Sequence, residues 1–183
     1  LGSPKIIIDG SLAGAGAHGF RADNNWCYIH GLSIVNFSGD GIRTTRHNGE
    51  MSGMYIGVMP DGITPAPNGG YGVNIINGND WEVGKYYRDK NVISGNTAGG
   101  VMFDGAGCYD GRVVNSYIGT NATGTSACGV QPIGIEIKGG AYNIEIGNGN
   151  ATGLNLVSGN TSNGIRITTA STHNVTIHGN YIG

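Results

Sequence analysis

The sequence predicts an all-β fold, a single-stranded right-handed parallel β-helix (a solenoid) of about six to seven coils. Glycine supplies 36 of the 183 residues and charged residues only 12%, while Ile occurs 21 times against five Leu. Branched side chains favour strands and glycine is unfavourable in helices, so this composition indicates a β core with many turns. A long internal repeat indicates that equivalent strands recur at a regular interval along the chain.

Two kinds of landmark recur at the same long interval. Residues 91–96 (NVISGN) return as residues 155–160 (NLVSGN), an offset of 155 − 91 = 64. The tripeptide Tyr-Ile-Gly begins at Tyr55, Tyr117 and Tyr181, which are 62 and 64 residues apart. Landmarks that agree on one period are typical of repeat proteins, in which equivalent residues stack on one another.

A shorter unit lies inside this period and consists of a glycine followed by alternating apolar residues. Its glycines are Gly19, Gly41, Gly72, Gly100, Gly134 and Gly164. The alternation predicts very short strands without helical crossovers, which stack directly when coils lie about 4.7–4.9 Å apart. The apolar positions are expected to form one inward ladder, Ile42, Val73, Val101, Ile135 and Ile165. The alternate positions are expected to line up on one exposed face, Arg43, Asn74, Met102, Glu136 and Arg166.

The turns between strands are marked by glycine and asparagine. Aligning strand ends gives one column, Gly31, Gly53, Gly95, Asn115, Gly159 and Gly179. Because Gly and Asn adopt the left-handed conformation most cheaply, the column predicts one corner of every coil. Asn96, Asn160 and Asn180 follow such corners, and we expect their amides to satisfy turn backbone groups coil after coil.

Segments 7–10, 31–42, 91–96 and 117–125 together resemble the parallel β-helix repeat proteins of bacterial surfaces, within the pectin-lyase-like group. The resemblance covers essentially the whole chain and implies one parallel β-helix domain over 1–183. The sequence departs from the pattern at 58–71 and 78–90, where longer loops are expected. Proteins of this kind are secreted or attached to the cell surface, and their relatives include polysaccharide lyases, hydrolases and epimerases.

Charged residues offer little sign of catalysis. Neighbouring coils are expected to bring Glu136 beside Arg166, and Glu82 beside Arg112 or Lys85, as surface ion pairs. The outward column holds a single acid, Glu136, so no catalytic residue is assigned. The five histidines lack the spacing of a metal site. No cofactor is expected, with a calcium ion at the oxygen-rich turn around Asn121 as the alternative.

The aromatic residues indicate a contact patch, and the cysteines allow two interpretations. Tyr86, Tyr87 and Arg88 form a candidate patch for carbohydrate or a partner protein, because aromatic faces stack well on both. Trp81 aligns with core Ile144 and is expected to be buried. The three cysteines are interpreted as small buried hydrophobes, with a Cys108–Cys128 disulfide as the alternative.

The partners follow from charge and from the edges of a solenoid. A net charge of −2 gives no footprint for nucleic acid, and no apolar run is long enough to span a membrane. Strand edges favour end-to-end self-association or further coils of a longer solenoid or assembly. The sequence therefore predicts a secreted or cell-surface structural or adhesive module without catalysis. The alternative is a carbohydrate-active enzyme (polysaccharide lyase, hydrolase or epimerase) or a polysaccharide-binding module.

Overall fold

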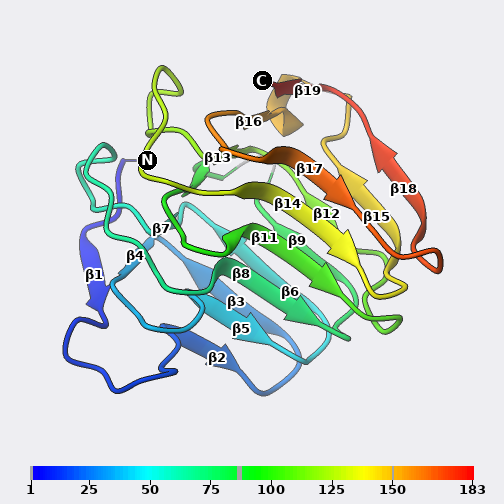
Figure 1. The fold of residues 1–183 in the computed structure, drawn as a ribbon, viewed down its shortest axis with the longest axis horizontal. Helices are drawn as coiled ribbons and strands as arrows, with labels where there is room; N and C mark the ends of the chain where they lie inside the picture. The colour runs from blue at the N-terminus through cyan, green and yellow to red at the C-terminus, as the bar shows by residue number, and fades with distance from the viewer. Residues whose placement is uncertain (1, 86–87, 150) are drawn as a thin grey trace.

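A computed structural model describes residues 2–85, 88–149 and 151–183 of the chain. The described residues form three parallel sheets, and each of six successive coils contributes one strand to each sheet, with β19 (Asn180–Ile182) as a seventh strand of one sheet (Figure 1). This is a single-stranded parallel β-helix, as the repeat predicts. A single 3₁₀ turn, Ala151–Gly153, is the one helical element among the described residues. None of these residues belongs to a helix with the length and apolar character that crossing a membrane requires.

Every third strand of the chain pairs in the same sheet. Sheet A contains β1 (Ile6–Asp9), β4 (Leu32–Val35), β7 (Tyr55–Ile56), β10 (Asn91–Ile93), β13 (Ser116–Ile118), β16 (Asn155–Val157) and β19 (Asn180–Ile182). Sheet B contains β2 (Phe20–Ala22), β5 (Ile42–Thr44), β8 (Tyr71–Ile76), β11 (Gly99–Asp104), β14 (Ile133–Lys138) and β17 (Asn163–Ile167). Sheet C contains β3 (Cys27–His30), β6 (Gly49–Ser52), β9 (Trp81–Val83), β12 (Arg112–Val113), β15 (Tyr142–Ile146) and β18 (His173–Ile177).

The predicted inward ladder is confirmed rung by rung in sheet B. Ile42 pairs with Val73, Val73 with Val101, Val101 with Ile135, and Ile135 with Ile165. The first four are fully buried, and Ile165 packs against the core from a partly buried position. Stacked branched side chains therefore fill the interior along the whole solenoid.

The outward column is also in register, but the expectation that it is exposed along its length is wrong. Asn74, Met102 and Glu136 occupy the middle rungs and are at most 5% exposed. Tyr71 contributes to this burial, because its hydroxyl reaches the carboxylate of Glu136 from two coils away. The middle of this face is therefore a covered polar layer.

The predicted left-handed corner residues all have positive φ, between 47° and 75°, but they belong to two corners instead of one. Gly31, Gly53, Asn115 and Gly179 lie between a strand of sheet C and the next strand of sheet A. Gly95 and Gly159 follow strands of sheet A. At both corners an apolar residue, such as Ile29 or Ile93, stands two positions before the Gly or Asn, so the sequence pattern merges the two corners.

Side-chain amides form the predicted ladder at these corners. The Nδ2 atoms of Asn96 and Asn160 donate to the carbonyls of Ile56 and Ile118, at 3.0 and 3.2 Å. Asn180 Nδ2 donates to the carbonyl of Ile146 at 2.8 Å. Each amide thus satisfies a carbonyl in the coil before its own, and Asn96 does so in a fully buried position.

Long and short connections from sheet A to sheet B alternate along the solenoid. Residues 57–70 and 119–132 are long, whereas 94–98 and 158–162 are short. Each long loop carries a small antiparallel bridge, Val58 with Pro65 and Thr120 with Ala127. The long loops touch each other across the short one, since Ala122 N donates to the carbonyl of Gly62 at 2.8 Å. In the other predicted loop region, 78–90, residues 81–83 form β9.

Trp81 and the cysteines complete the interior. Trp81 is fully buried, as predicted, and its indole N–H donates to the carbonyl of Arg46 at 2.7 Å. All three cysteines are free thiols, so the alternative Cys108–Cys128 disulfide is not formed. Cys108 and Cys128 are buried, whereas Cys27 is half-buried.

Candidate functional site

The outer surface of sheet C holds a groove of about 520 Å³, which we call the sheet C groove. Two columns of side chains line it. The first column holds the outward residues of the strands, Tyr28, Glu50, Glu82, Arg112 and Glu145. The second lies two residues earlier in each coil, Trp26, Asn48, Asp80, Asp110 and Asn143. The groove therefore runs along the solenoid axis.

The second column forms the corner between sheets B and C, and every member has a left-handed backbone. The φ angles of Trp26, Asn48, Asp80, Asp110, Asn143 and Asn174 lie between 51° and 62°. Asn and Asp are the non-glycine residues that adopt this conformation most readily. Their side chains also join neighbouring coils, since Asn143 Nδ2 donates to Asp110 Oδ1 at 3.1 Å. Sequence reasoning missed this column.

Ion pairs between coils connect the charged residues of the first column. Lys85 bridges Glu50, at 3.1 Å, and Glu82. Arg112 bridges Glu82, at 3.1 Å, and Glu145, at 2.7 Å, so both predicted partners of Glu82 are confirmed. His178 Nε2 lies 3.0 Å from the other oxygen of Glu145. The carboxylates alternate with cations along four successive coils.

The environment of these groups favours their charged forms. The hydrogen bond to Glu82 raises the pKa of Lys85 against the opposing effect of its partial burial. Burial would raise the pKa of Glu145, but hydrogen bonds from His178 and Arg112 outweigh it and lower the pKa below its ordinary value. Lys85 and Glu145 are therefore charged, and their ion-pair partners fix their positions in the groove.

Two aromatic side chains stand at the end of the groove nearest β1. Trp26 is 66% exposed and Tyr28 is 58% exposed. Both rings line the groove beside Asn48 and Glu50 of the next coil. This end of the groove thus offers apolar ring surface to solvent, next to amide and carboxylate groups.

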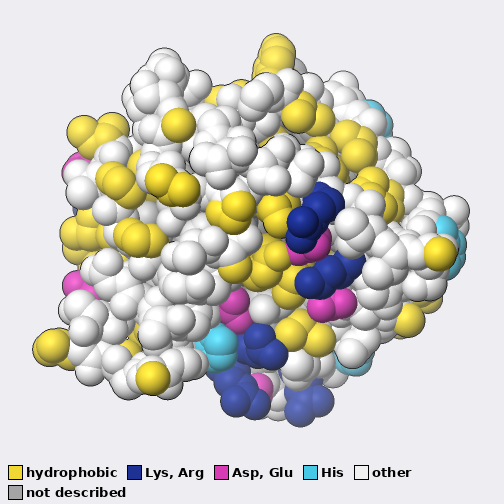
Figure 2. All heavy atoms as spheres, viewed as in Figure 1, with side chains coloured by type: hydrophobic (Ala, Val, Ile, Leu, Met, Phe, Trp, Pro, Cys, Tyr) yellow, Lys and Arg dark blue, Asp and Glu magenta, His cyan; other side chains and the backbone are white. Residues whose placement is uncertain are grey.

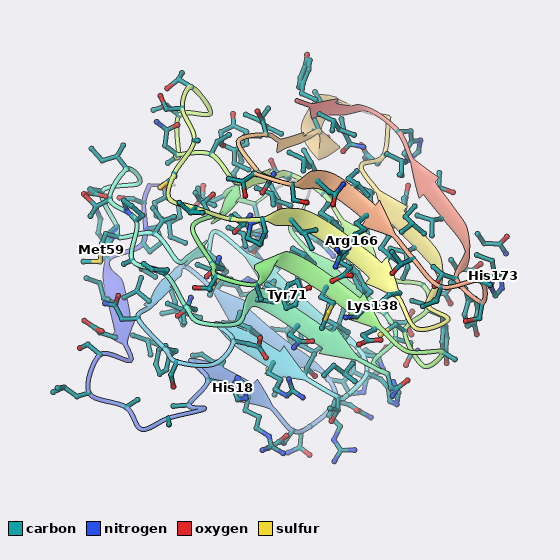
Figure 3. All side chains as sticks on the ribbon, in the orientation of Figure 1. His18, Met59, Tyr71, Lys138, Arg166 and His173 are labelled. Carbon is teal, nitrogen blue, oxygen red and sulfur yellow. The ribbon has the colours of Figure 1, made fainter. Side chains whose placement is uncertain are left out.

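A second polar cluster lies on the outer face of sheet B. Figure 2 shows Lys and Arg side chains interleaved with Asp and Glu over this sheet, and Figure 3 shows Tyr71, Lys138 and Arg166 over the same part of it. Arg166 binds Glu136 through two hydrogen bonds, of 3.0 and 2.6 Å. The predicted pair is confirmed, but its acid is 1% exposed, so it is not a surface ion pair.

The sheet B cluster contains a second buried acid that the sequence pattern did not place there. Asp40 precedes β5 and accepts hydrogen bonds from Arg43, at 3.1 Å, and Asn74, at 2.9 Å. It also accepts one from the backbone N–H of Tyr71 at 2.8 Å. Asp40 reaches the outward column from a turn, and for this reason strand alternation could not find it.

Hydrogen bonding decides the charge state of Glu136. Burial alone would raise the pKa of its carboxyl, but hydrogen bonds from Tyr71 and Arg166 outweigh this and hold the pKa below its ordinary value. Burial and the hydrogen bond to Glu136 raise the pKa of the Tyr71 hydroxyl. Glu136 is thus an ionised carboxylate held by the neutral phenol of Tyr71 and by two cations, Arg166 and Lys138, with Lys138 Nζ 3.8 Å from its carboxylate.

The predicted contact patch is only partly within the described residues. Tyr86 and Tyr87 lie outside them. Arg88 is exposed, and its carbonyl accepts a hydrogen bond from Asn115 Nδ2 at 2.9 Å. Near the predicted calcium turn, Asn121 Oδ1 accepts hydrogen bonds from Thr123 and Thr125, both 3.0 Å long. The described parts of the chain bring together no group of three His, Cys, Asp or Glu side chains that could hold a metal ion.

Comparison of the chain with protein-family models, curated proteins and solved structures finds no match. The fold and the groove define a parallel β-solenoid with a polar and aromatic outer face. Function is inferred from this geometry.

Proposed function

We propose that this chain is a non-catalytic structural or adhesive module of a secreted or cell-surface protein, of the pectin-lyase-like type that its sequence resembles. The observation that supports this most strongly is the pairing of the outer-face carboxylates. Glu82, Glu145 and Glu136 are each bound by cations from neighbouring coils. Such pairs tie one coil to the next and favour a stiff rod.

The pKa directions support the same role. A general acid for glycoside cleavage needs a carboxyl whose pKa is raised toward the working pH. Among the described residues, the resolved pKa shifts of carboxyl groups are all downward, at Asp9, Asp61, Glu136 and Glu145. These groups are ionised at neutral pH and suit the binding of cations and hydroxyls better than the donation of a proton.

Self-association is part of the proposal. The outermost strands of each sheet have one neighbour, and the exposed side chains there include Ile6 at one end and Ile177 and Ile182 at the other. Pairing with the strands of a second copy would satisfy backbone groups and cover these residues. Sedimentation at increasing concentration should show head-to-tail oligomers, and a monomer at every concentration would contradict this part.

A carbohydrate-active enzyme is the competing function, because a polar groove is present. The purified chain is incubated with neutral and acidic polysaccharides, and reducing ends and unsaturated products are measured. We expect neither to form. Cleavage that is lost in Glu136→Gln or Glu82→Gln would overturn the non-catalytic assignment.

A further inference from the structure

We propose that the sheet C groove binds a neutral saccharide chain, which lies along the solenoid axis with one end stacked on Trp26 and Tyr28. The inference deepens the adhesive role proposed above and rests on it. Four features of the described residues carry it: a strained tryptophan, a second exposed ring, a polar repeat along the groove, and an excess of acid.

Trp26 occupies a position where its backbone is strained. Its φ is 62°, a left-handed conformation that costs free energy for any residue with a large side chain. The equivalent positions of the next five coils hold Asn48, Asp80, Asp110, Asn143 and Asn174. Burial does not compensate for the strain at Trp26, because two-thirds of the side chain is exposed. A ligand that stacks on the indole ring would account for this choice of residue.

Tyr28 extends the same apolar surface. It lies two residues after Trp26 and points outward from β3, in register with Glu50 of the next coil. The aromatic faces of Trp and Tyr pack well against the apolar C–H face of a pyranose ring, while their polar edges remain hydrated. Both rings line the groove, and together they offer a platform for the end of a sugar chain.

The rest of the groove repeats polar groups at the spacing of the coils. Successive coils lie about 4.7–4.9 Å apart, which is close to the rise of one sugar unit in an extended pyranose chain. Asp80, Asp110 and Asn143 present carboxylate and amide oxygens at this spacing along one side of the groove. Sugar hydroxyls donate to such oxygens. The ion pairs of Lys85 and Arg112 hold the opposite side in place before any ligand arrives, which lowers the entropic cost of binding.

Charge selects among saccharides. Five carboxylates and two cations line the groove, so an incoming uronate chain would meet an excess of like charge. A neutral chain avoids this repulsion and keeps the hydroxyl contacts. A protein partner is the competing occupant, because exposed Trp and Tyr are also common in protein interfaces.

The test uses neutral hexasaccharides of glucose, xylose and mannose, with polygalacturonate as the anionic probe, in titration calorimetry against the whole chain. We expect at least one neutral probe to bind and polygalacturonate to bind more weakly. Trp26→Asn and Tyr28→Ala should each weaken binding about tenfold. The matched control is Tyr181→Ala, since Tyr181 is equally exposed at the opposite end and should not affect binding.

Fluorescence provides a second measurement. The chain contains two tryptophans, and Trp81 is fully buried, so a shift in emission on adding sugar would report Trp26. The shift should disappear in Trp26→Asn. Any of four results would overturn the inference: no binding of any neutral probe, unchanged binding in Trp26→Asn, tighter binding of polygalacturonate, or capture of a protein in place of sugar. Polysaccharide cleavage would instead overturn the non-catalytic role, and binding would still be measurable in that case.

Discussion

Trp26 shows how strongly one backbone position selects its side chain. Asn at the equivalent place in other coils accepts a left-handed φ at lower cost. We therefore expect Trp26→Asn to raise the free energy of unfolding by about 1 kcal/mol, because it relieves the backbone strain. Little packing should be lost, since the indole ring is exposed. Urea unfolding of both proteins measures this. A clear loss of stability in the variant would show that the indole ring packs against its neighbours more than its exposure indicates.

Glu136 is a buried acid whose charge makes the stability of the fold depend on pH. Its pKa in the folded chain lies below the ordinary value of 4.5, so its contribution to stability is complete above that pH and is lost as the pH falls through the folded value. Glu136→Gln should lower the free energy of unfolding by about 1–3 kcal/mol at pH 7, since it removes a buried ionic hydrogen-bond partner.

Urea unfolding at neutral and acidic pH tests this expectation. The difference between wild type and Glu136→Gln should shrink as the pH falls below 4.5. A difference that stays constant with pH would mean that the carboxyl is not ionised in the folded state.

Asn96 tests the buried amides. It is fully buried, and its side chain donates to the carbonyl of Ile56 and accepts from Asn68 Nδ2 at 2.9 Å. Asn96→Ala should cost about 1–3 kcal/mol, because it leaves buried backbone groups without partners. Asn24→Ala, at an exposed turn position, is the matched control and should change stability by less than about 0.5 kcal/mol. Equal effects of the two substitutions in urea unfolding would contradict the ladder.

Two separate constraints favour glycine at the corners: a positive φ, and a lack of space for a side chain. Substitution can separate them. Gly31 and Gly119 both have positive φ, 68° and 92°. A Cβ at Gly31 meets no atom within 4 Å, whereas a Cβ at Gly119 would lie 2.3 Å from the carbonyl oxygen of Ser158. Gly31→Ala should cost about 1–2 kcal/mol for conformation alone, and Gly119→Ala about 2–4 kcal/mol because crowding is added. Thermal or urea unfolding that ranks them in the opposite order would contradict the corner geometry.

The sequence predicts strands and ladders well because they depend on local alternation. Ile42, Val73 and Val101 stand at matching places in short period-two segments, and this pattern alone sets their direction and their rung. The corners are less well predicted, since Gly31 and Gly95 follow different sheets yet look alike in sequence.

The candidate site could be predicted only in part. The pairing of Glu82 with Arg112 follows from the coil period, so the sequence reveals it. Asp40 reaches its cluster from a turn of variable length, and the Tyr71 ring reaches the carboxylate of Glu136 two coils away. Neither contact obeys the alternation. The column of Asn48, Asp80 and Asp110 carries a signal that sequence reasoning did not use. In every coil after the first, an Asn or Asp stands two residues before the outward residue of sheet C.

The whole molecule is stabilised by contacts between neighbouring coils, as in other repeat proteins. Strands of the central coils, such as β8, β11 and β14, have partners on both sides, whereas β17, β18 and β19 have one. Amide hydrogen exchange on the 183-residue chain should therefore be slowest in the central coils and fastest in the outermost strands, where opening breaks one interface instead of two. Uniform protection along the axis would indicate that the solenoid opens only as a single unit.

Because long and short connections alternate, the repeating unit of this solenoid is two coils. The solenoid should therefore gain or lose coils in pairs. The loop at 57–70 finds its match at 119–132, and the hydrogen bond between Ala122 and Gly62 spans the short connection between them. Loss of one coil would set two long loops directly against each other, whereas gain or loss of a pair would preserve every neighbour. Genetic duplication within such a protein is therefore expected to proceed by even numbers of turns.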